Sequence, residues 1–383
     1  MAQMHSRRAA VAVLAAMLTA ACAVGPAVGL ASSEAPRSPR AAGALAGESR
    51  PRFSDDGAAG EEALGESLVA FRFDAGAPPS GPPAVGPDGA VYVATIEGYV
   101  HGLARDGTFL SSYTLPQRLE GGLVADAEGI VYAAAPGGRI YALRPSGPLL
   151  WGLKIPVQPA TELTPGPHGW LVFAAHDHNV YGVSRQGVAR WRSSVGKRIT
   201  ATPALDAAGR VVVGTADGFL YALEPFQRRF RVQLGGPIAS VRAGADGRLW
   251  VVAGDTLYSL DRQLAVRVRR PGVAAVAPWA GGAVALGAGG EIAWLRPDGG
   301  EACERAIAGM GREVAVDAEG TVYVAQDEGA LAVVPESGHV WRVRIGHAPV
   351  GAVVFDAARR RVIALSDDGS LAVLHALPRR SSR

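Results

Sequence analysis

The chain has 383 residues, with 38 Lys+Arg against 35 Asp+Glu and a formal net charge of +3. So small a charge implies no strongly basic or acidic partner and argues against nucleic-acid binding. All the cationic residues except Lys154 and Lys197 are arginines, and we attribute this excess to codon bias rather than to a binding patch. Glycine (50) and proline (26) are abundant, which favours many turns and few long helices. Only Cys22 and Cys303 are present, which excludes a disulfide framework and a cysteine-clustered metal site.

Residues 1–22 have the form of a secretory signal peptide. Arg7 and Arg8 precede an apolar run, residues 9–21, that is too short to cross a bilayer. The run ends at Cys22 in a segment, residues 18–22, that resembles a bacterial lipoprotein box, although Thr19 stands where that pattern usually has leucine. We therefore expect export and lipidation of Cys22; the alternative is an ordinary signal cleaved near residues 29–31.

Three further segments follow the signal. Residues 23–66 lack apolar periodicity and are expected to form a disordered tether, which would reach roughly 35–40 Å if it behaves as a coil. Residues 67–377 form the folded domain, and residues 378–383 are an Arg/Ser tail. A lipidated Cys22 followed by Ala23 would place the protein on the periplasmic face of the outer membrane, with the membrane contacted only through the lipid. Without lipidation it would be a soluble periplasmic protein.

One unit of about 40 residues recurs eight times from residue 67 onward. A glycine marks seven of the units, and Arg360 holds the eighth position. These markers are Gly89, Gly129, Gly169, Gly209, Gly247, Gly282, Gly320 and Arg360. An aromatic residue recurs at a similar period, as Phe71, Trp151, Trp191, Phe230 and Trp341. Two independent markers with a similar period indicate a true repeat.

Each unit contains four short apolar stretches with the alternation of β-strands. Tight-turn residues separate the second and third stretches. They are Glu97-Gly98, Gly137-Gly138, Asp177-His178, Asp217-Gly218, Gly254-Asp255, Gly289-Gly290, Glu328-Gly329 and Asp368-Gly369. Four antiparallel strands in about 40 residues make one propeller blade, so the sequence predicts an all-β, eight-bladed propeller. WD repeats share this length, but no Trp-Asp pair occurs in the chain.

The two ends of the repeat region are complementary. Residues 68–76 match the fourth strand of other units but have no preceding strands of their own. The last unit supplies only three strands, at residues 350–355, 362–365 and 371–374. We therefore expect the N-terminal strand to pair with residues 371–374, which would close the ring and remove two exposed sheet edges.

The repeat resembles that of the pyrroloquinoline-quinone-type (PQQ-like) β-propeller family. The string Gly-x-Val-Tyr-Val, then Asp-Gly-x-Leu-Tyr-Ala-Leu and a closing tryptophan, is clearest at 129–151, 169–191, 209–230 and 320–341. Units five and six depart from it, with Ala293 in place of the tyrosine and Trp294 one position late. With its signal and possible lipoprotein cysteine, the chain is most similar to the propeller lipoproteins of the outer-membrane β-barrel assembly machinery. That resemblance implies a monomeric, non-enzymatic scaffold, without a cofactor, whose partners are envelope or outer-membrane assembly proteins.

The competing interpretation is a periplasmic propeller enzyme that uses a quinone or binds another small ligand. Quinoprotein dehydrogenases share this repeat, and the resemblance implies that such an enzyme needs adjacent cysteines and a calcium held by Glu, Asn and Asp. Only Cys303 lies in the repeats, and Asn179 is the sole asparagine of the chain. We therefore assign no catalytic, cofactor-binding or metal-binding residue.

The remaining polar residues have structural interpretations. His176, Asp177 and His178 could ligate a metal, but Asp177 occupies the turn position of the repeat and His178 replaces its glycine. The recurrent turn acids suit tight turns and need no catalytic explanation. His101 stands where other units have tyrosine and is expected to be a packed, hydrogen-bonded substitute. We expect the hairpin turns to share one face with the inter-blade loops, which would place them beside a set of cations. This set is Arg118, Lys197, Arg198, Arg270, Arg312 and His347.

Overall fold

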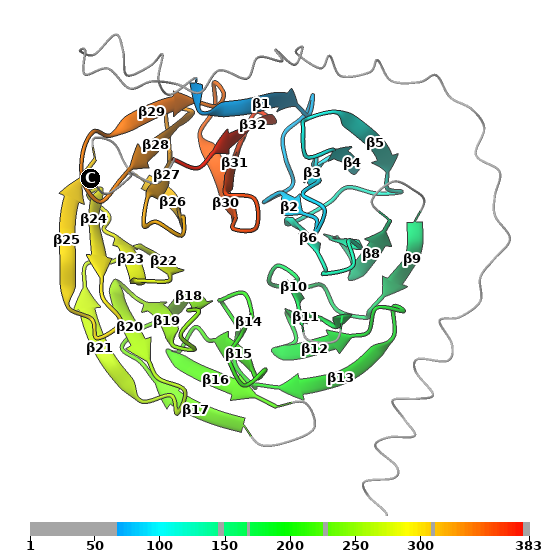
Figure 1. Cartoon of the computed structure of the whole chain (residues 1–383). Helices are drawn as coiled ribbons and strands as arrows, with labels where there is room; N and C mark the ends of the chain where they lie inside the picture. The colour runs from blue at the N-terminus through cyan, green and yellow to red at the C-terminus, as the bar shows by residue number, and fades with distance from the viewer. Residues whose placement is uncertain (1–66, 145–148, 167–168, 225–228, 308–310, 378–383) are drawn as a thin grey trace, which may run out of the picture. The chain divides into compact units, whose positions relative to one another are not determined.

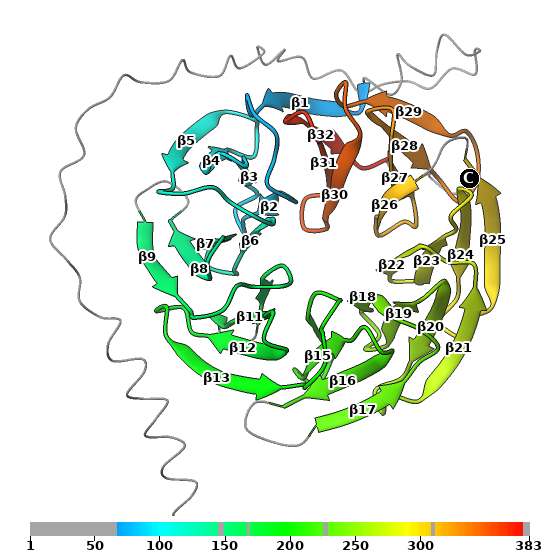
Figure 2. The ribbon, with the colours of Figure 1, turned by 180° about the vertical axis from the view of Figure 1, so that it is seen from behind.

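The computed structural model describes residues 67–144, 149–166, 169–224, 229–307 and 311–377. Their 32 strands form eight antiparallel sheets of four strands, arranged as blades around a central axis (Figure 1 and Figure 2). This confirms the predicted all-β propeller and its blade number. Within this part of the chain, no helix has the length and apolar character needed to cross a membrane.

Each of the first seven blades uses four consecutive strands, from the axis outward. The strands of blades 1 to 4 are β2 (Ala84–Val85), β3 (Val91–Ala94), β4 (Tyr99–Leu103), β5 (Phe109–Thr114), β6 (Leu123–Ala125), β7 (Val131–Ala135), β8 (Arg139–Leu143), β9 (Leu149–Lys154), β10 (Thr164–Pro165), β11 (Leu171–Ala174), β12 (Asn179–Val183), β13 (Ala189–Ser194), β14 (Ala204–Leu205), β15 (Val211–Gly214), β16 (Phe219–Leu223) and β17 (Arg229–Gln233). In these four blades the innermost strands have only two or three residues.

Blades 5 to 8 complete the ring. Their strands are β18 (Ile238–Ala243), β19 (Leu249–Ala253), β20 (Thr256–Leu260), β21 (Val266–Pro271), β22 (Ala275–Trp279), β23 (Gly282–Leu286), β24 (Glu291–Leu295), β25 (Glu301–Ala306), β26 (Gly311–Val316), β27 (Val322–Gln326), β28 (Ala330–Val334), β29 (Trp341–Arg344), β30 (Val350–Asp356), β31 (Arg361–Ser366) and β32 (Ser370–His375), together with β1 (Val69–Asp74). Units five and six form regular blades despite their irregular repeats.

The hydrophobic core consists of eight clusters, one between each pair of neighbouring blades. The cluster between blades 8 and 1 joins Val91 and Leu103 of blade 1 to Ile363 and Val373 of blade 8. Each fully buried Val, Leu or Ile side chain stabilises the fold by roughly 1.5–3 kcal/mol. Because the last seam is packed like the other seven, the ring is closed on itself.

The two ends of the domain form one sheet. Strand β1 pairs antiparallel with β32, with Val69 opposite Leu374 and Phe73 opposite Leu371. In both views β1, in blue, lies along β32, in red (Figure 1 and Figure 2). The predicted closure of the ring by the N-terminal strand is therefore confirmed, and β1 covers the edge that β32 would otherwise expose.

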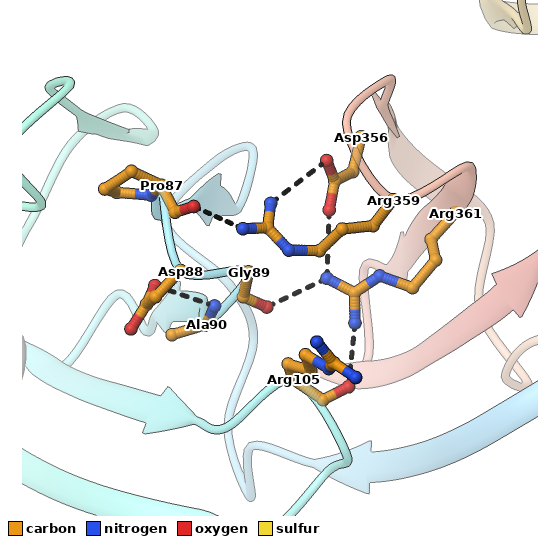
Figure 3. Close-up of polar contacts among 8 residues, drawn as sticks. All are labelled: Pro87, Asp88, Gly89, Ala90, Arg105, Asp356, Arg359 and Arg361. Atoms are coloured by element: carbon orange, nitrogen blue, oxygen red, sulfur yellow. Dashed lines mark hydrogen bonds and ion pairs between the residues drawn. The ribbon is translucent and has the colours of Figure 1, made fainter.

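A buried polar cluster adds to the seam between blades 8 and 1 (Figure 3). Arg361 is 5% exposed and donates to the carbonyl oxygens of Gly89 and Arg105, both at 2.8 Å. Its guanidinium also lies 3.0 Å from the buried carboxylate of Asp356. Arg359 donates to the carbonyl oxygen of Pro87 and lies 3.5 Å from Asp356. These bonds join the last blade to two turns of the first.

Among the described residues, three other than glycine have a left-handed backbone. His178 (φ 64°) and Arg360 (φ 53°) occupy positions at which most other blades carry a left-handed glycine, as the repeat alignment indicated. The third is Leu264 (φ 64°), which is 4% exposed and packs in the core between blades 4 and 5. Such residues cost roughly 1–2 kcal/mol of backbone strain, which the surrounding structure must offset.

Candidate protein-interaction face and axial channel

We use the term hairpin face for the side of the ring that carries the turns between the second and third strands of each blade. In an antiparallel blade, these turns lie on the same side as the loops that connect one blade to the next. The turns between the first and second strands, and between the third and fourth strands, lie on the opposite face. The hairpin turns therefore stand beside the inter-blade loops, as the sequence predicted.

One hydrogen bond is repeated in all eight blades and ties each inter-blade loop to a hairpin turn. In each case the residue after the fourth strand donates its N–H to a carbonyl oxygen of the turn, at 2.7–3.1 Å. The pairs are Leu115 to Gly98, Ile155 to Gly138, Val195 to His178, Leu234 to Gly218, Val273 to Asp255, Ile307 to Gly290, Ile345 to Gly329 and Ala75 to Gly369. The hairpin face is therefore held by the blades at eight equivalent points.

The donor residue of this bond is also a buried aliphatic anchor. Leu115 and Ile155 are 3% exposed, and the equivalent residues of the other blades are likewise buried. The side chain of this residue packs in the core, and its backbone N–H bonds to the hairpin turn. The same residue therefore fixes both the start of the inter-blade loop and the turn beside it. This repeated position was missed in the sequence, although an aliphatic residue one or two positions after each fourth strand would have revealed it.

The charges of the hairpin face are mixed. Lys197 lies 3.5 Å from Asp217, and Arg312 contacts Asp327 and lies 3.7 Å from Asp367. Arg118 and Arg198 are exposed in inter-blade loops and form no ion pair among the residues that the structure describes. These two arginines are therefore available to an acidic group of a partner.

Arg270 does not pair with an acidic hairpin turn. It lies on the outermost strand of blade 5 and bonds at 2.5 Å to Glu301 of the neighbouring outermost strand, with Glu304 at 3.7 Å. The strand register places Arg270 beside the hairpin turn at Asp255, as expected, but its side chain joins two outer strands instead of pairing with a turn acid.

Asp368 fixes the inter-blade loop between blades 7 and 8. Its carboxylate accepts the N–H groups of His347 at 2.7 Å, Ala348 at 3.2 Å and Ser370 at 2.9 Å. Partial burial alone would raise the pKa of Asp368, but these backbone donors outweigh it and hold that pKa at about 2. His347 remains exposed above this anchored loop.

The His176-Asp177-His178 cluster forms a hairpin turn. The carboxylate of Asp177 accepts hydrogen bonds from Asn179 Nδ2 at 2.5 Å and from the Tyr181 hydroxyl at 2.6 Å. His178 supplies the left-handed turn position. In the described ranges, no three His, Cys, Asp or Glu side chains converge in a metal-binding arrangement. The structure thus assigns Asp177 and His178 to the turn.

His176 instead borders a hollow of about 320 Å³ between blades 2 and 3. The polar part of its wall also contains Glu120, Gln158, Thr161 and Glu162, and Gln158 Nε2 donates to Glu120 Oε2 at 2.7 Å. The sequence did not predict that these residues meet, because they belong to two blades. The volume is at the lower limit for small-molecule sites and is sufficient for one inserted side chain.

Three charged residues lie on or beside innermost strands of different blades. Glu162 precedes β10, Arg242 lies on β18 and Glu313 lies on β26, so each comes from an innermost strand region of a different blade. Desolvation by the surrounding protein raises the pKa of both carboxyls, and Arg242 partly offsets it. Glu313 also accepts the N–H of Val353 at 3.1 Å. This hydrogen bond links blades 7 and 8.

His101 is packed as predicted, but it is not hydrogen-bonded as expected. It is 6% exposed and lies among the rings of Phe73, Tyr99 and Phe109. Neither ring nitrogen has a hydrogen-bond partner of normal geometry among the described residues. Burial lowers the pKa of His101 below its ordinary value of 6.5, and the nearby Ala75 backbone only partly opposes this effect.

The residues present do not fit a quinone and calcium site. Cys303 is half-buried on β25, the outermost strand of blade 6, far from the axis around which the blades are arranged. The side chain of Asn179 is bonded to Asp177 in the hairpin turn. The two residue types that such a site requires therefore lie in different blades and have other partners. Cys22, the expected lipidation site, lies outside the described residues.

Fold and repeat together define a class: an eight-bladed β-propeller built from PQQ-like repeats. A family model described as outer membrane protein assembly factor BamB matches residues 176–313. Residues 176–313 are therefore similar to this family of propeller proteins, in a range that includes the irregular units five and six.

Solved structures agree with this assignment at the level of the fold. BamB from Moraxella catarrhalis has a TM-score of 0.68 and 14% identity, over 80% of this chain and 99% of that chain. Sqt1 from Saccharomyces cerevisiae has a TM-score of 0.69 and 12% identity, over 80% and 98%. Virginiamycin B lyase from Staphylococcus aureus, an enzyme by name, has a TM-score of 0.56 and 12% identity, over 80% and 98%. No curated protein matches the chain by sequence.

Proposed function

We propose that this protein is a non-enzymatic interaction scaffold of the bacterial cell envelope that serves outer-membrane protein assembly. The observation that carries the proposal is the hairpin face, in which eight loops are each held by a buried aliphatic residue and a backbone hydrogen bond. Loops fixed on a rigid frame lose little entropy when they bind a partner. The similarity of residues 176–313 to BamB supports an assembly protein as that partner.

The binding surface within this face includes the inter-blade loops that follow blades 1 and 3. These loops carry Arg118 and Arg198, which are exposed, and the loop with Arg118 also supplies Glu120 to the wall of the hollow beside His176. Complementary charge determines which partner binds and how fast it associates more than it determines the final affinity. An acidic segment of an assembly protein would fit between the two arginines, with one side chain inserted in the hollow.

Charge reversal on the two faces tests the proposal. Arg118→Glu/Arg198→Glu alters the hairpin face, and Arg105→Glu/Arg144→Glu makes the same change in net charge in turns of the opposite face. After mild crosslinking of the envelope, the wild-type protein should co-purify with a component of the outer-membrane β-barrel assembly machinery. The first variant should lose most of this component and the second should retain it. Equal loss from both variants, or co-purification of no assembly component with the wild type, would contradict the proposal.

The proposed anchor is a lipid on Cys22, which would hold the propeller at the periplasmic face of the outer membrane. A single acyl chain binds a membrane weakly, so stable retention needs several chains on the same residue. Cys22→Ser should release the protein into the soluble periplasmic fraction without a change in its melting temperature. Unchanged retention in the membrane fraction would exclude the anchor.

A further inference from the structure

Three consecutive blades carry arginines at equivalent positions on their outermost strands. In blades 3, 4 and 5 the sequences of these strands are Ala189–Ser194 (ARWRSS), Arg229–Gln233 (RFRVQ) and Val266–Pro271 (VRVRRP), with no aspartate or glutamate. The outermost strand of blade 6, Glu301–Ala306 (EACERA), is by contrast acidic. The arginines that seemed dispersed in the sequence are therefore concentrated by the fold on one arc of the ring.

The register shows that the array is regular. Arg192 lies opposite Tyr181, Arg231 opposite Tyr221 and Arg269 opposite Tyr258, so the same cross-strand Tyr–Arg pair occurs in three neighbouring blades. Blades 1, 2, 6, 7 and 8 have no such pair. A second arginine lies two positions earlier in each strand, as Arg190, Arg229 and Arg267.

Aromatic rings orient two of the three exposed guanidinium groups of the pairs. The guanidinium carbon of Arg231 lies 5.4 Å from the ring centroid of Phe219, and that of Arg269 lies 5.9 Å from the ring centroid of Tyr258. Stacking on a ring leaves the edge of the guanidinium free to donate to a carboxylate. Arg192, Arg231 and Arg269 form no ion pair among the described residues, whereas Arg267 pairs with Asp261 at 2.5 Å. We define the arginine belt as Arg190, Arg192, Arg231 and Arg269.

We propose that the arginine belt binds a flexible acidic polysaccharide. The belt follows the convex circumference of the ring along β13, β17 and β21, shown in green to yellow (Figure 1). A flat bilayer would touch such a curve over one blade, whereas a flexible chain can follow it over three. The guanidinium group of arginine binds a carboxylate through two parallel hydrogen bonds. Ser193 and Gln233 lie on the same strands as the arginines and can form hydrogen bonds with sugar hydroxyls.

The spacing of the charges also favours a sparsely charged polymer. The arginines are grouped by blade, and each group is separated from the next by the width of a blade. A polysaccharide with carboxylates along an uncharged backbone can place a charge at each group without crowding charge between them. Binding shared over several blades should therefore increase with chain length, because each additional contact is made at high effective concentration.

Binding of polygalacturonate to the purified full-length protein tests the proposal. The variant Arg192→Gln/Arg231→Gln/Arg269→Gln should bind at least about tenfold more weakly than the wild type. The control Arg105→Gln/Arg144→Gln/Arg296→Gln removes the same charge from exposed turns of the face opposite the hairpin face and should change binding less than about twofold. Binding should weaken steeply with added NaCl, and trigalacturonate should bind much more weakly than the polymer. Equal effects of the two variants would overturn the proposal.

A second readout does not depend on the folding of any variant. Polygalacturonate should protect Arg192, Arg231 and Arg269 of the wild-type protein from modification by phenylglyoxal, measured by mass spectrometry, and should leave Arg105 and Arg144 reactive. Vesicles of anionic lipid, polyphosphate and single-stranded DNA serve as competing probes. Protection by one of these probes without protection by polygalacturonate would overturn the proposal, as would the absence of protection by any probe.

Discussion

Arg361 donates a hydrogen bond to the carbonyl oxygen of Gly89 at 2.8 Å, although 272 positions separate the two residues in the chain (Figure 3). The same guanidinium reaches Arg105 of blade 1 and Asp356 of blade 8. The last blade of the ring is therefore bonded to the first through a buried arginine, in addition to their hydrophobic contact. Because closure of the ring depends on the contact between blades 8 and 1, mutations in this cluster test how much that contact stabilises the fold.

Replacement of Arg361 by alanine should lower the free energy of unfolding by about 3–5 kcal/mol. The change leaves the buried Asp356 carboxylate and two backbone carbonyls without their charged donor. Arg359→Ala is the matched control, because the Arg359 side chain is more exposed and should cost about 1 kcal/mol or less. Urea unfolding monitored by tryptophan fluorescence measures both, and equal losses would show that Arg361 does not hold the seam.

Removal of the N-terminal strand should open the ring. A chain that starts at residue 80 lacks β1 and exposes the edge of β32, so it should lose cooperative melting and aggregate. A chain that starts at residue 60 keeps β1 and should melt like the mature protein. Size-exclusion chromatography and calorimetry distinguish the two. A monomeric residue-80 chain with an unchanged melting temperature would show that β1 is dispensable for closure.

The fold could be predicted from the sequence because each blade is a local unit. Four strands and their turns lie within about 40 residues, so Gly129 or Asp217-Gly218 identifies a turn without knowledge of distant contacts. Closure was also predictable, since residues 68–76 lacked neighbouring strands in the chain and the last unit lacked its fourth strand. Both signals depend only on the pairing of strands.

Contacts between blades could not be predicted in the same way. Three groups of residues depend on how separate sheets pack against each other. They are Glu120 with His176, the charges of Glu162, Arg242 and Glu313, and the bond of Arg361 to Gly89. Repeat alignment gives the register within a blade but not the direction of a long side chain between two blades. Arg270 illustrates this limit, because its side chain reaches the next outer strand instead of a hairpin turn.

His101 should make stability depend on pH. Burial lowers its pKa in the folded state, so at mildly acidic pH the unfolded chain binds a proton that the folded chain does not. This contribution favours folding at neutral pH and is lost as the pH falls below 6.5, the ordinary histidine value. His101→Tyr introduces the tyrosine that blades 2 to 5 carry at this position and should flatten the curve of melting temperature between about pH 7.5 and 5.5. Parallel curves for the two proteins would exclude this role.

The left-handed residues His178 and Leu264 should respond to glycine in opposite directions. His178 is an exposed turn residue, so His178→Gly relieves backbone strain and should stabilise the protein by about 0.5–1 kcal/mol. Leu264 has the same φ, but its side chain is buried between blades 4 and 5. Leu264→Gly should therefore destabilise by about 2 kcal/mol or more, because lost packing exceeds relieved strain. Chemical denaturation of both variants checks the signs.

The most direct test of the scaffold function is site-specific photocrosslinking in living cells. A photoreactive amino acid at position 198 lies on the hairpin face, and the same amino acid at position 144 lies on the opposite face and serves as the control. Position 198 should crosslink to a component of the outer-membrane β-barrel assembly machinery, and position 144 should not. Crosslinks to that machinery from position 144 alone, or from neither position, would contradict the assignment of the hairpin face as the binding surface.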